Sequence, residues 1–204
     1  MSLNQCYLLL LAVPLLGADG PPVPRTVINF AYTATVTRGL SIPEGPTIPE
    51  GIVVSGTFAY DLGDVLLPQI TAEFAAIGYR FYPGANNKVT VKDTPTFEQF
   101  EISQSRSSIW AETLPIQKYY AASGITLINT NPEVNALQGE NLPLSLALQD
   151  FTQATLKVSI WNQQGPGGGS LEAEINTLTQ SSPSDGDSNT SKTDARSGNR
   201  EVSK

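Results

Sequence analysis

Glu172 and Glu174 form the clearest pair of side chains that could do acid–base chemistry. They alternate with the apolar residues Leu171 and Ala173, so on a strand both carboxylates point to one face, with Cα atoms about 6.5–7 Å apart. Carboxylates about 5–5.5 Å apart act as acid and nucleophile in retaining glycosidases. Jelly-roll glycosidases carry a third acid two positions further on, where this chain has Asn176. The simpler interpretation is a solvated strand face whose charges discourage edge pairing.

A set of aromatic residues offers a second chemistry, the stacking of a ring on a sugar. Trp161 has the parity opposite to the apolar positions of residues 156–160, so it is expected to point outward or to the rim of a sheet. Tyr119 and Tyr120 could contribute to the same carbohydrate-binding surface, and Trp110 belongs to the same set. The alternative is that these rings close the end of a hydrophobic core.

Asp61 and Asp64 are weak candidates for calcium ligands. They flank Leu62 and Gly63 directly after an expected strand, and Ca²⁺ takes six to eight oxygen ligands. Two acids without the spacing of a dedicated loop are usually turn formers, so we expect no metal and no cofactor.

Two residue types that carry most catalytic chemistry are nearly absent. The chain of 204 residues has no histidine, and its one cysteine, Cys6, lies in an apolar leader. Serine–histidine–aspartate and cysteine–histidine sites, zinc ligation by these residues and stabilising disulfides are therefore excluded from the rest of the chain. We expect a protein that is not an enzyme.

The elements that must position these side chains are predicted to be strands. Residues 26–38 alternate cleanly, with Ile28, Phe30 and Tyr32 on one face and polar residues on the other, and residues 52–60 repeat the pattern. Between them, the repeated sequences SIPEG and TIPEG have the Pro and Gly positions of turns and predict a connecting loop.

Further short strands are expected throughout the chain. Residues 69–77 favour a helical turn, although a strand is nearly as compatible with their apolar spacing. Many short strands without alternating helices predict an all-β fold, an antiparallel, jelly-roll-like β-sandwich of roughly eight to ten strands. The other expected strands are residues 77–82, 88–92, 97–103, 107–112, 124–129, 154–161 and 170–178.

The last predicted hairpin carries a resemblance to a known group of proteins. Residues 142–151 (LPLSLALQDF), residues 154–160 (ATLKVSI), a Gly-rich tip and residues 171–178 (LEAEINTL) follow one another there. With VSGTFAYD at residues 54–61, this arrangement resembles exported bacterial β-sandwich proteins of unknown function of the PEP-CTERM-associated type. The resemblance implies a sandwich outside the cytoplasm and no activity. The Pro-Glu-Pro sorting signal of that group does not follow residue 178.

The two ends of the chain predict export and a polar tail. An apolar run too short to span a bilayer is typical of a signal peptide, expected over residues 1–18, with a Pro-rich linker at 19–25. The β-sandwich domain is expected over residues 26–179. Residues 180–204 are rich in Ser, Asp, Asn and Thr, which predicts a disordered tail.

Charge narrows the expected partners. The net charge is −7, and the tail is neutral, so the whole excess of acid lies on the expected domain. Such a surface repels nucleic acids and anionic headgroups. We therefore expect a secreted or cell-surface protein that acts as a structural or adhesion component, with extracellular polysaccharide or envelope components as partners. A carbohydrate-binding module and a carboxylate-based glycosidase are the alternatives.

Overall fold

The computed structural model describes residues 26–43, 45–62, 68–111, 119–163 and 167–181. The predicted signal peptide and linker lie outside these residues, and so does the predicted tail apart from its first two residues. Gln180 and Ser181 belong to the last strand. No helix among the described residues has the length and apolar character needed to cross a bilayer.

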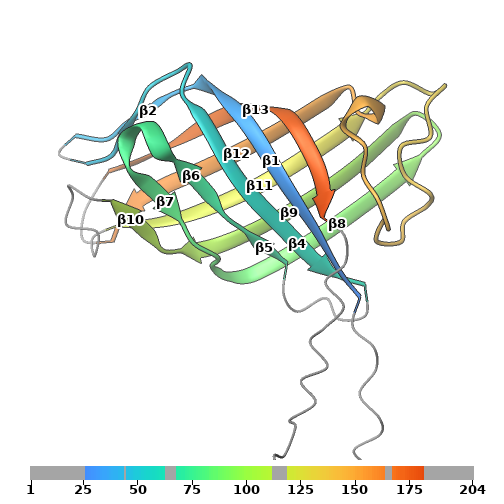
Figure 1. Ribbon diagram of the computed structural model, residues 1–204, viewed down its shortest axis with the longest axis horizontal. Helices are drawn as coiled ribbons and strands as arrows, with labels where there is room; N and C mark the ends of the chain where they lie inside the picture. Colours follow the sequence, from blue (N-terminus) through green and yellow to red (C-terminus); the bar gives the residue numbers. More distant parts are fainter. Residues whose placement is uncertain (1–25, 44, 63–67, 112–118, 164–166, 182–204) are drawn as a thin grey trace, which may run out of the picture.

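The described residues confirm the prediction of an all-β antiparallel fold (Figure 1). Long strands dominate, and the only helical segments are two single 3₁₀ turns within the described part of the chain. The elements are β1 (Val27–Arg38), β2 (Leu40–Ser41), β3 (Thr47–Ile48), β4 (Val53–Asp61), β5 (Gln69–Ile70), β6 (Ala72–Phe74), η1 (Ala75–Ile77), β7 (Tyr79–Phe81), β8 (Ala85–Thr94), β9 (Phe97–Ser107), β10 (Ile109–Ala111), β11 (Tyr119–Asn129), η3 (Leu148–Asp150), β12 (Gln153–Asn162) and β13 (Gly168–Ser181).

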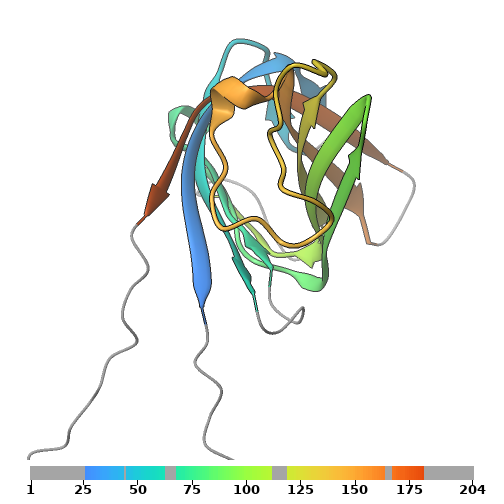
Figure 2. The ribbon, with the colours of Figure 1, turned by 90° about the vertical axis from the view of Figure 1, so that its right-hand side faces the viewer.

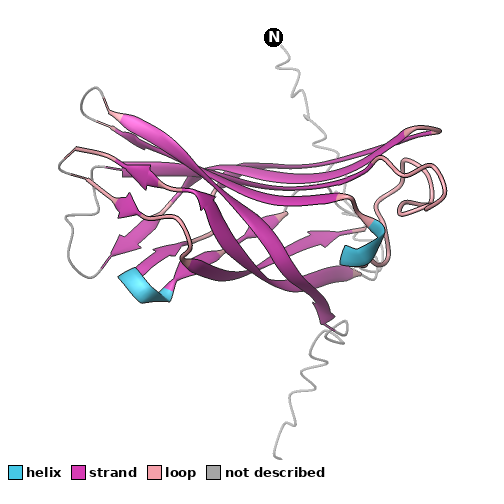
Figure 3. Cartoon of the chain, turned by 90° about the horizontal axis from the view of Figure 1, so that it is seen from above, coloured by secondary structure: helices cyan, strands magenta, loops and turns pink. Residues whose placement is uncertain are grey.

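One large sheet curls around a single core. Its strand order is β10-β7-β6-β4-β1-β13-β12-β11-β9-β8, with β5 paired to β4. The chain itself connects the two ends of this order. At one corner β9 continues into β10 after Ser108, and beside it β7 continues into β8 after three residues. The N–H of Tyr82 donates to the carbonyl of Ser108 at 3.0 Å, which extends the pairing between these two bent strands. A jelly-roll sandwich of two packed sheets is therefore not confirmed (Figure 3).

Alternation in β1 works as the sequence predicts. Its alternate positions Ile28, Phe30, Tyr32, Ala34 and Val36 are buried on the inner face of the sheet, and the intervening residues face outward. Rings from neighbouring strands pack there, with centroids 4.8 Å apart for Phe30 and Phe58 and 5.4 Å apart for Tyr60 and Phe100. Burial of such rings supplies most of the driving force for closing the sheet.

Gly56, the glycine of the VSG motif, is required by a close approach inside the sheet. A Cβ added to Gly56 would lie 2.1 Å from the carbonyl oxygen of Thr71 and 2.6 Å from the Tyr32 hydroxyl. That hydroxyl donates to the same Thr71 carbonyl at 2.7 Å. Burial raises the pKa of Tyr32, so the phenol stays a donor. The motif is thus a packing feature.

Two local predictions need correction. Residues 69–77 form β5, β6 and the 3₁₀ turn η1 instead of one helical turn, because Ile70, Ala72 and Phe74 alternate into the core with period two. The repeat of residues 41–51 is more than a loop. It carries the hairpin β2–β3, and Ile48 is completely buried there.

The connection between β11 and β12 lies across one end of the curled sheet, as Figure 2 shows. It runs from Thr130 to Thr152 and contains η3. Leu137, Leu146 and Phe151 in this connection are buried and belong to the same core as the strands. The connection therefore closes the end of the curled sheet across which it lies.

Candidate functional site

Tyr120 and Trp161 form an aromatic pair on the outer face of the sheet. They are register partners on β11 and β12, and their ring centroids lie 6.3 Å apart with an angle of 50° between the planes. Tyr120 is 40% exposed and Trp161 is partly exposed. Trp161 has the outward parity that the sequence predicts, because Val158 and Ile160 on the same strand face the core.

Tyr119 is not part of this outer surface, which corrects the predicted grouping. It is only 8% exposed, and it faces the interior as a member of the core. The reason is parity, since adjacent residues on a strand point to opposite faces. The sequence already contained this signal, because Tyr119 and Tyr120 are consecutive.

Gly168 keeps one flank of Trp161 open. It is the register partner of Trp161 on β13, and a Cβ added there would lie 3.2 Å from the Trp161 Cβ and 2.8 Å from the Ile160 carbonyl. The indole therefore has Tyr120 on one side and a residue without a side chain on the other. Trp110 pairs with Arg80 between β10 and β7, and its side chain lies outside the described residues.

Glu172 and Glu174 both lie on the outer face of β13, as their spacing predicts. The Glu172 carboxylate accepts a hydrogen bond from the Arg38 guanidinium at 2.9 Å and lies 3.9 Å from the Lys157 ammonium. Glu172 therefore has two cationic partners on the outer face of the sheet. The amide of Asn176 donates to the Thr35 hydroxyl at 2.7 Å, so this residue also has a structural partner.

Only one of the two predicted calcium ligands lies within the described residues. Asp61 is the last residue of β4 and is buried, with a relative exposure of 8%. Asp64 lies outside the described residues. Among the residues that are described, no three histidine, cysteine, aspartate or glutamate side chains gather where they could hold a metal ion.

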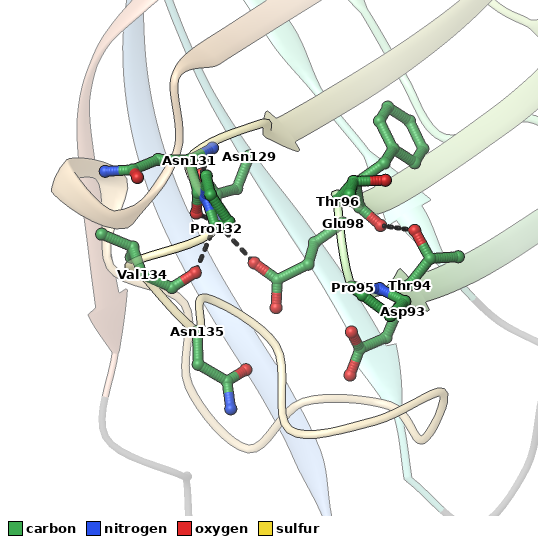
Figure 4. Close-up of a pocket in the computed structure, with 11 residues that line it drawn as sticks. Asp93, Thr94, Pro95, Thr96, Glu98, Asn129, Asn131, Pro132, Val134 and Asn135 are labelled. Carbon is green, nitrogen blue, oxygen red and sulfur yellow. Dashed lines mark hydrogen bonds between the residues drawn. The ribbon is translucent and has the colours of Figure 1, made fainter.

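Glu98 is a buried carboxylate, within the described part of the chain, that the sequence did not single out (Figure 4). It accepts hydrogen bonds from the Asn129 side-chain amide at 2.6 Å and from the backbone N–H groups of Ala136 and Leu137, each at 3.0 Å. Its parity with Phe100 and the other core positions of β9 was the available signal, since it places an acid on the inner face.

The hydrogen bonds decide the ionisation of Glu98. Burial alone would raise the pKa of this carboxyl, but the bonds from Asn129, Leu137 and Ala136 outweigh burial and lower the pKa below its usual value. On the neighbouring strand, the Asp93 carboxylate accepts the N–H of Gly139 at 2.7 Å. Both acids thus fasten the β11–β12 connection to β8 and β9, and we call the contacts of Glu98 with this connection the Glu98 joint. A pocket of about 270 Å³ lies beside them.

Comparison of the chain with protein-family models, with curated proteins and with solved structures found no match. Functional interpretation therefore depends on the geometry of the described side chains. Among the residues that the sequence singled out, the structure brings together Tyr120 and Trp161. It separates Tyr119 from them and gives Glu172 cationic partners.

Proposed function

We propose that this protein is an exported, non-enzymatic adhesion component of the cell surface or extracellular matrix that binds polysaccharide through Tyr120 and Trp161. The observation that carries the proposal is the pairing of these two rings on the outer face, 6.3 Å apart. Two neighbouring aromatic residues supply a large contact area at little cost in conformational entropy. Their faces suit the apolar C–H surfaces of sugar rings, while the Tyr hydroxyl and Trp N–H suit sugar hydroxyls.

The surroundings of the pair favour a binding role. Gly168 leaves access to the indole from one side, and Ser159 places a hydroxyl on the same face of β12 as Trp161. The overall acidity of the chain opposes binding to nucleic acids, whereas a neutral polysaccharide experiences no such repulsion. The ion pairs of Glu172 favour a structural role for the carboxylates of β13.

Binding of the full chain to immobilised polysaccharides tests the proposal. We expect Trp161→Ala to weaken binding about tenfold or more, and Tyr120→Ala to weaken it less, because a central aromatic anchor carries most of the energy of a contact. Val53→Ala is a matched control, since Val53 is an apolar residue that is 59% exposed on the outer face of β4. Its binding should equal that of the unchanged chain.

Two outcomes would contradict the proposal. One is the absence of binding to any polysaccharide or cell-envelope preparation, or binding that Trp161→Ala leaves unchanged. The other is hydrolysis of a polysaccharide that Glu172→Gln and Glu174→Gln each abolish, because this would identify an enzyme.

A further inference from the structure

We propose a second ligand site, for an uncharged glycan, in a groove on the outer face between β13 and β7. We call it the threonine groove. Its volume is about 640 Å³, which lies within the range of about 300–1,000 Å³ that is usual for small-molecule sites. It shares no residue with the Tyr120–Trp161 pair, so it extends the proposed function without depending on it. The side chains that define it are Thr33, Ser55, Thr57, Thr71, Thr177 and Thr179.

The hydroxyl groups of the groove are fixed in pairs. The Oγ1 atoms of Thr33 and Thr177 are 2.7 Å apart, and those of Thr57 and Thr71 are 2.9 Å apart. One hydroxyl donates in each pair, so the Thr33–Thr177 pair keeps a hydrogen and lone pairs for a ligand. In the other pair the Thr71 hydroxyl also donates to the Thr57 carbonyl at 3.5 Å, and this pair offers mainly lone pairs. Such groups match the mixed donor and acceptor character of sugar hydroxyls.

The floor of the groove is held rigid from beneath. Gly56 leaves space on the inner side for Tyr32, whose hydroxyl bonds to the carbonyl of Thr71. The Thr71 N–H in turn donates to the Thr57 carbonyl at 2.8 Å. Thr57 and Thr71 are thus placed by contacts of their backbone as well as by each other. A site that is ordered before binding loses less entropy when a ligand arrives.

Charge selects the class of ligand. The only charged residues that line the groove are Glu73 and Arg80, and they form an ion pair at 2.8 Å, so that they neutralise each other. On an acidic chain, a neutral hydroxyl-lined groove is complementary to an uncharged polyhydroxylated molecule. Anionic ligands find no unpaired cation among the lining residues.

Tyr82 supplies an aromatic surface at the rim. It lines the groove and is 45% exposed, which leaves much of its ring in contact with solvent. The methyl groups of the threonines and of Ala31 add apolar surface between the hydroxyls. Alternating apolar and hydroxyl surface beside an exposed ring is the arrangement that recognises the C–H and O–H groups of a sugar together.

Titration of the full chain with a panel of soluble neutral oligosaccharides, followed by calorimetry and NMR, tests the groove. The measurements use Trp161→Ala, so that the first surface does not contribute. We expect saturable binding that Thr33→Val and Tyr82→Ala each weaken by about threefold to tenfold, the range for one lost hydrogen bond or contact. Circular dichroism checks that each variant is folded.

The control is Thr130→Val. Thr130 belongs to a similar hydroxyl pair with Thr152, at 3.3 Å, outside the groove, and the affinity should not change. The proposal is overturned if no neutral oligosaccharide binds to Trp161→Ala, if Thr33→Val and Tyr82→Ala bind as well as Trp161→Ala alone, or if Thr130→Val weakens binding equally. Preference for an anionic saccharide or a peptide would overturn it as well.

Discussion

Glu98 and Gln104 lie six residues apart on the inner face of β9. Both connect this strand to another segment of the chain, but through different chemical groups. Gln104 bonds to both the N–H and the carbonyl of Ile70, at 3.0 and 2.6 Å, and also to Ser123. Glu98 accepts only, from one side-chain amide and from the backbone of residues 136 and 137. Each side chain joins β9 to a segment that has no strand pairing with it.

The difference shows how two closures of the curled sheet are made, one between β9 and β5 and one between β9 and the β11–β12 connection. At Gln104 the partner is a strand, whose backbone offers donors and acceptors alternately, so an amide satisfies it. At Glu98 the partner is a loop whose N–H groups converge, and a carboxylate satisfies several donors at once. The first closure is independent of pH, whereas the second depends on an ionised acid.

Glu98→Ala should have the largest effect on stability. It leaves the N–H groups of Ala136 and Leu137 without their acceptor and removes one of the acceptors of the Asn129 amide. We expect a loss of about 3 kcal/mol in the free energy of unfolding. Urea unfolding measures this loss. Glu101→Ala on the opposite face of β9 is the control and should change stability little. Equal stability of both variants would contradict the role given to Glu98.

Gln104→Leu should cost somewhat less, about 2 kcal/mol, because it leaves the buried Ile70 N–H and carbonyl unpaired but keeps the volume filled. The loss should be the same at neutral and acid pH, since no ionisable group is involved. Gln99→Leu, on the outer face, serves as control. A loss that appears only in acid would break the contrast with Glu98.

The unchanged chain should lose stability in acid at the Glu98 joint. The pKa of Glu98 is lower in the folded state than in the unfolded state. Its stabilisation is therefore complete above the ordinary glutamate value of about 4.3 and is lost as the pH falls through the lower folded value. Amide exchange of residues 136 and 137 should rise first. Glu98→Gln should flatten this dependence, and an unaltered acid profile would contradict the role given to Glu98.

Glu172→Gln should have the smallest effect, under about 0.5 kcal/mol. Its partner Arg38 is 55% exposed at the side chain, and exposed ion pairs contribute little after screening. Thermal unfolding at low and high salt measures it. A loss as large as that of Glu98→Ala would remove the distinction between buried and exposed carboxylates.

The sequence predicts the strands well and their closure poorly. Alternation in β1 is a local property, and it places Phe30 and Tyr32 on the core face without further information. The curl depends on contacts such as that of Gln104 with Ile70, which are 34 residues apart. No local pattern encodes which amide meets which backbone. Two separate sheets and one curled sheet therefore share the same pattern of alternation.

The same limit applies to the candidate site. Outward placement of Trp161 follows from parity alone, and the mistake with Tyr119 came from neglecting it. The partnership of Tyr120 with Trp161 needs the register of β11 against β12. The threonine groove is formed by residues of five strands, so the spacing of threonines along the sequence does not predict it.

The register of β13 also sets how the molecule carries a mechanical load. Trp161 is level with Gly168 at the start of β13, and Ser181 ends that strand beside Asn29. Tension between Ser181 and Trp161 runs along the length of β13, across the direction of its hydrogen bonds to β1 and β12. The bonds share this load in shear instead of being peeled apart one after another. Tension between Val27 and Ser181, in contrast, would unzip β1 from β13 at a single corner.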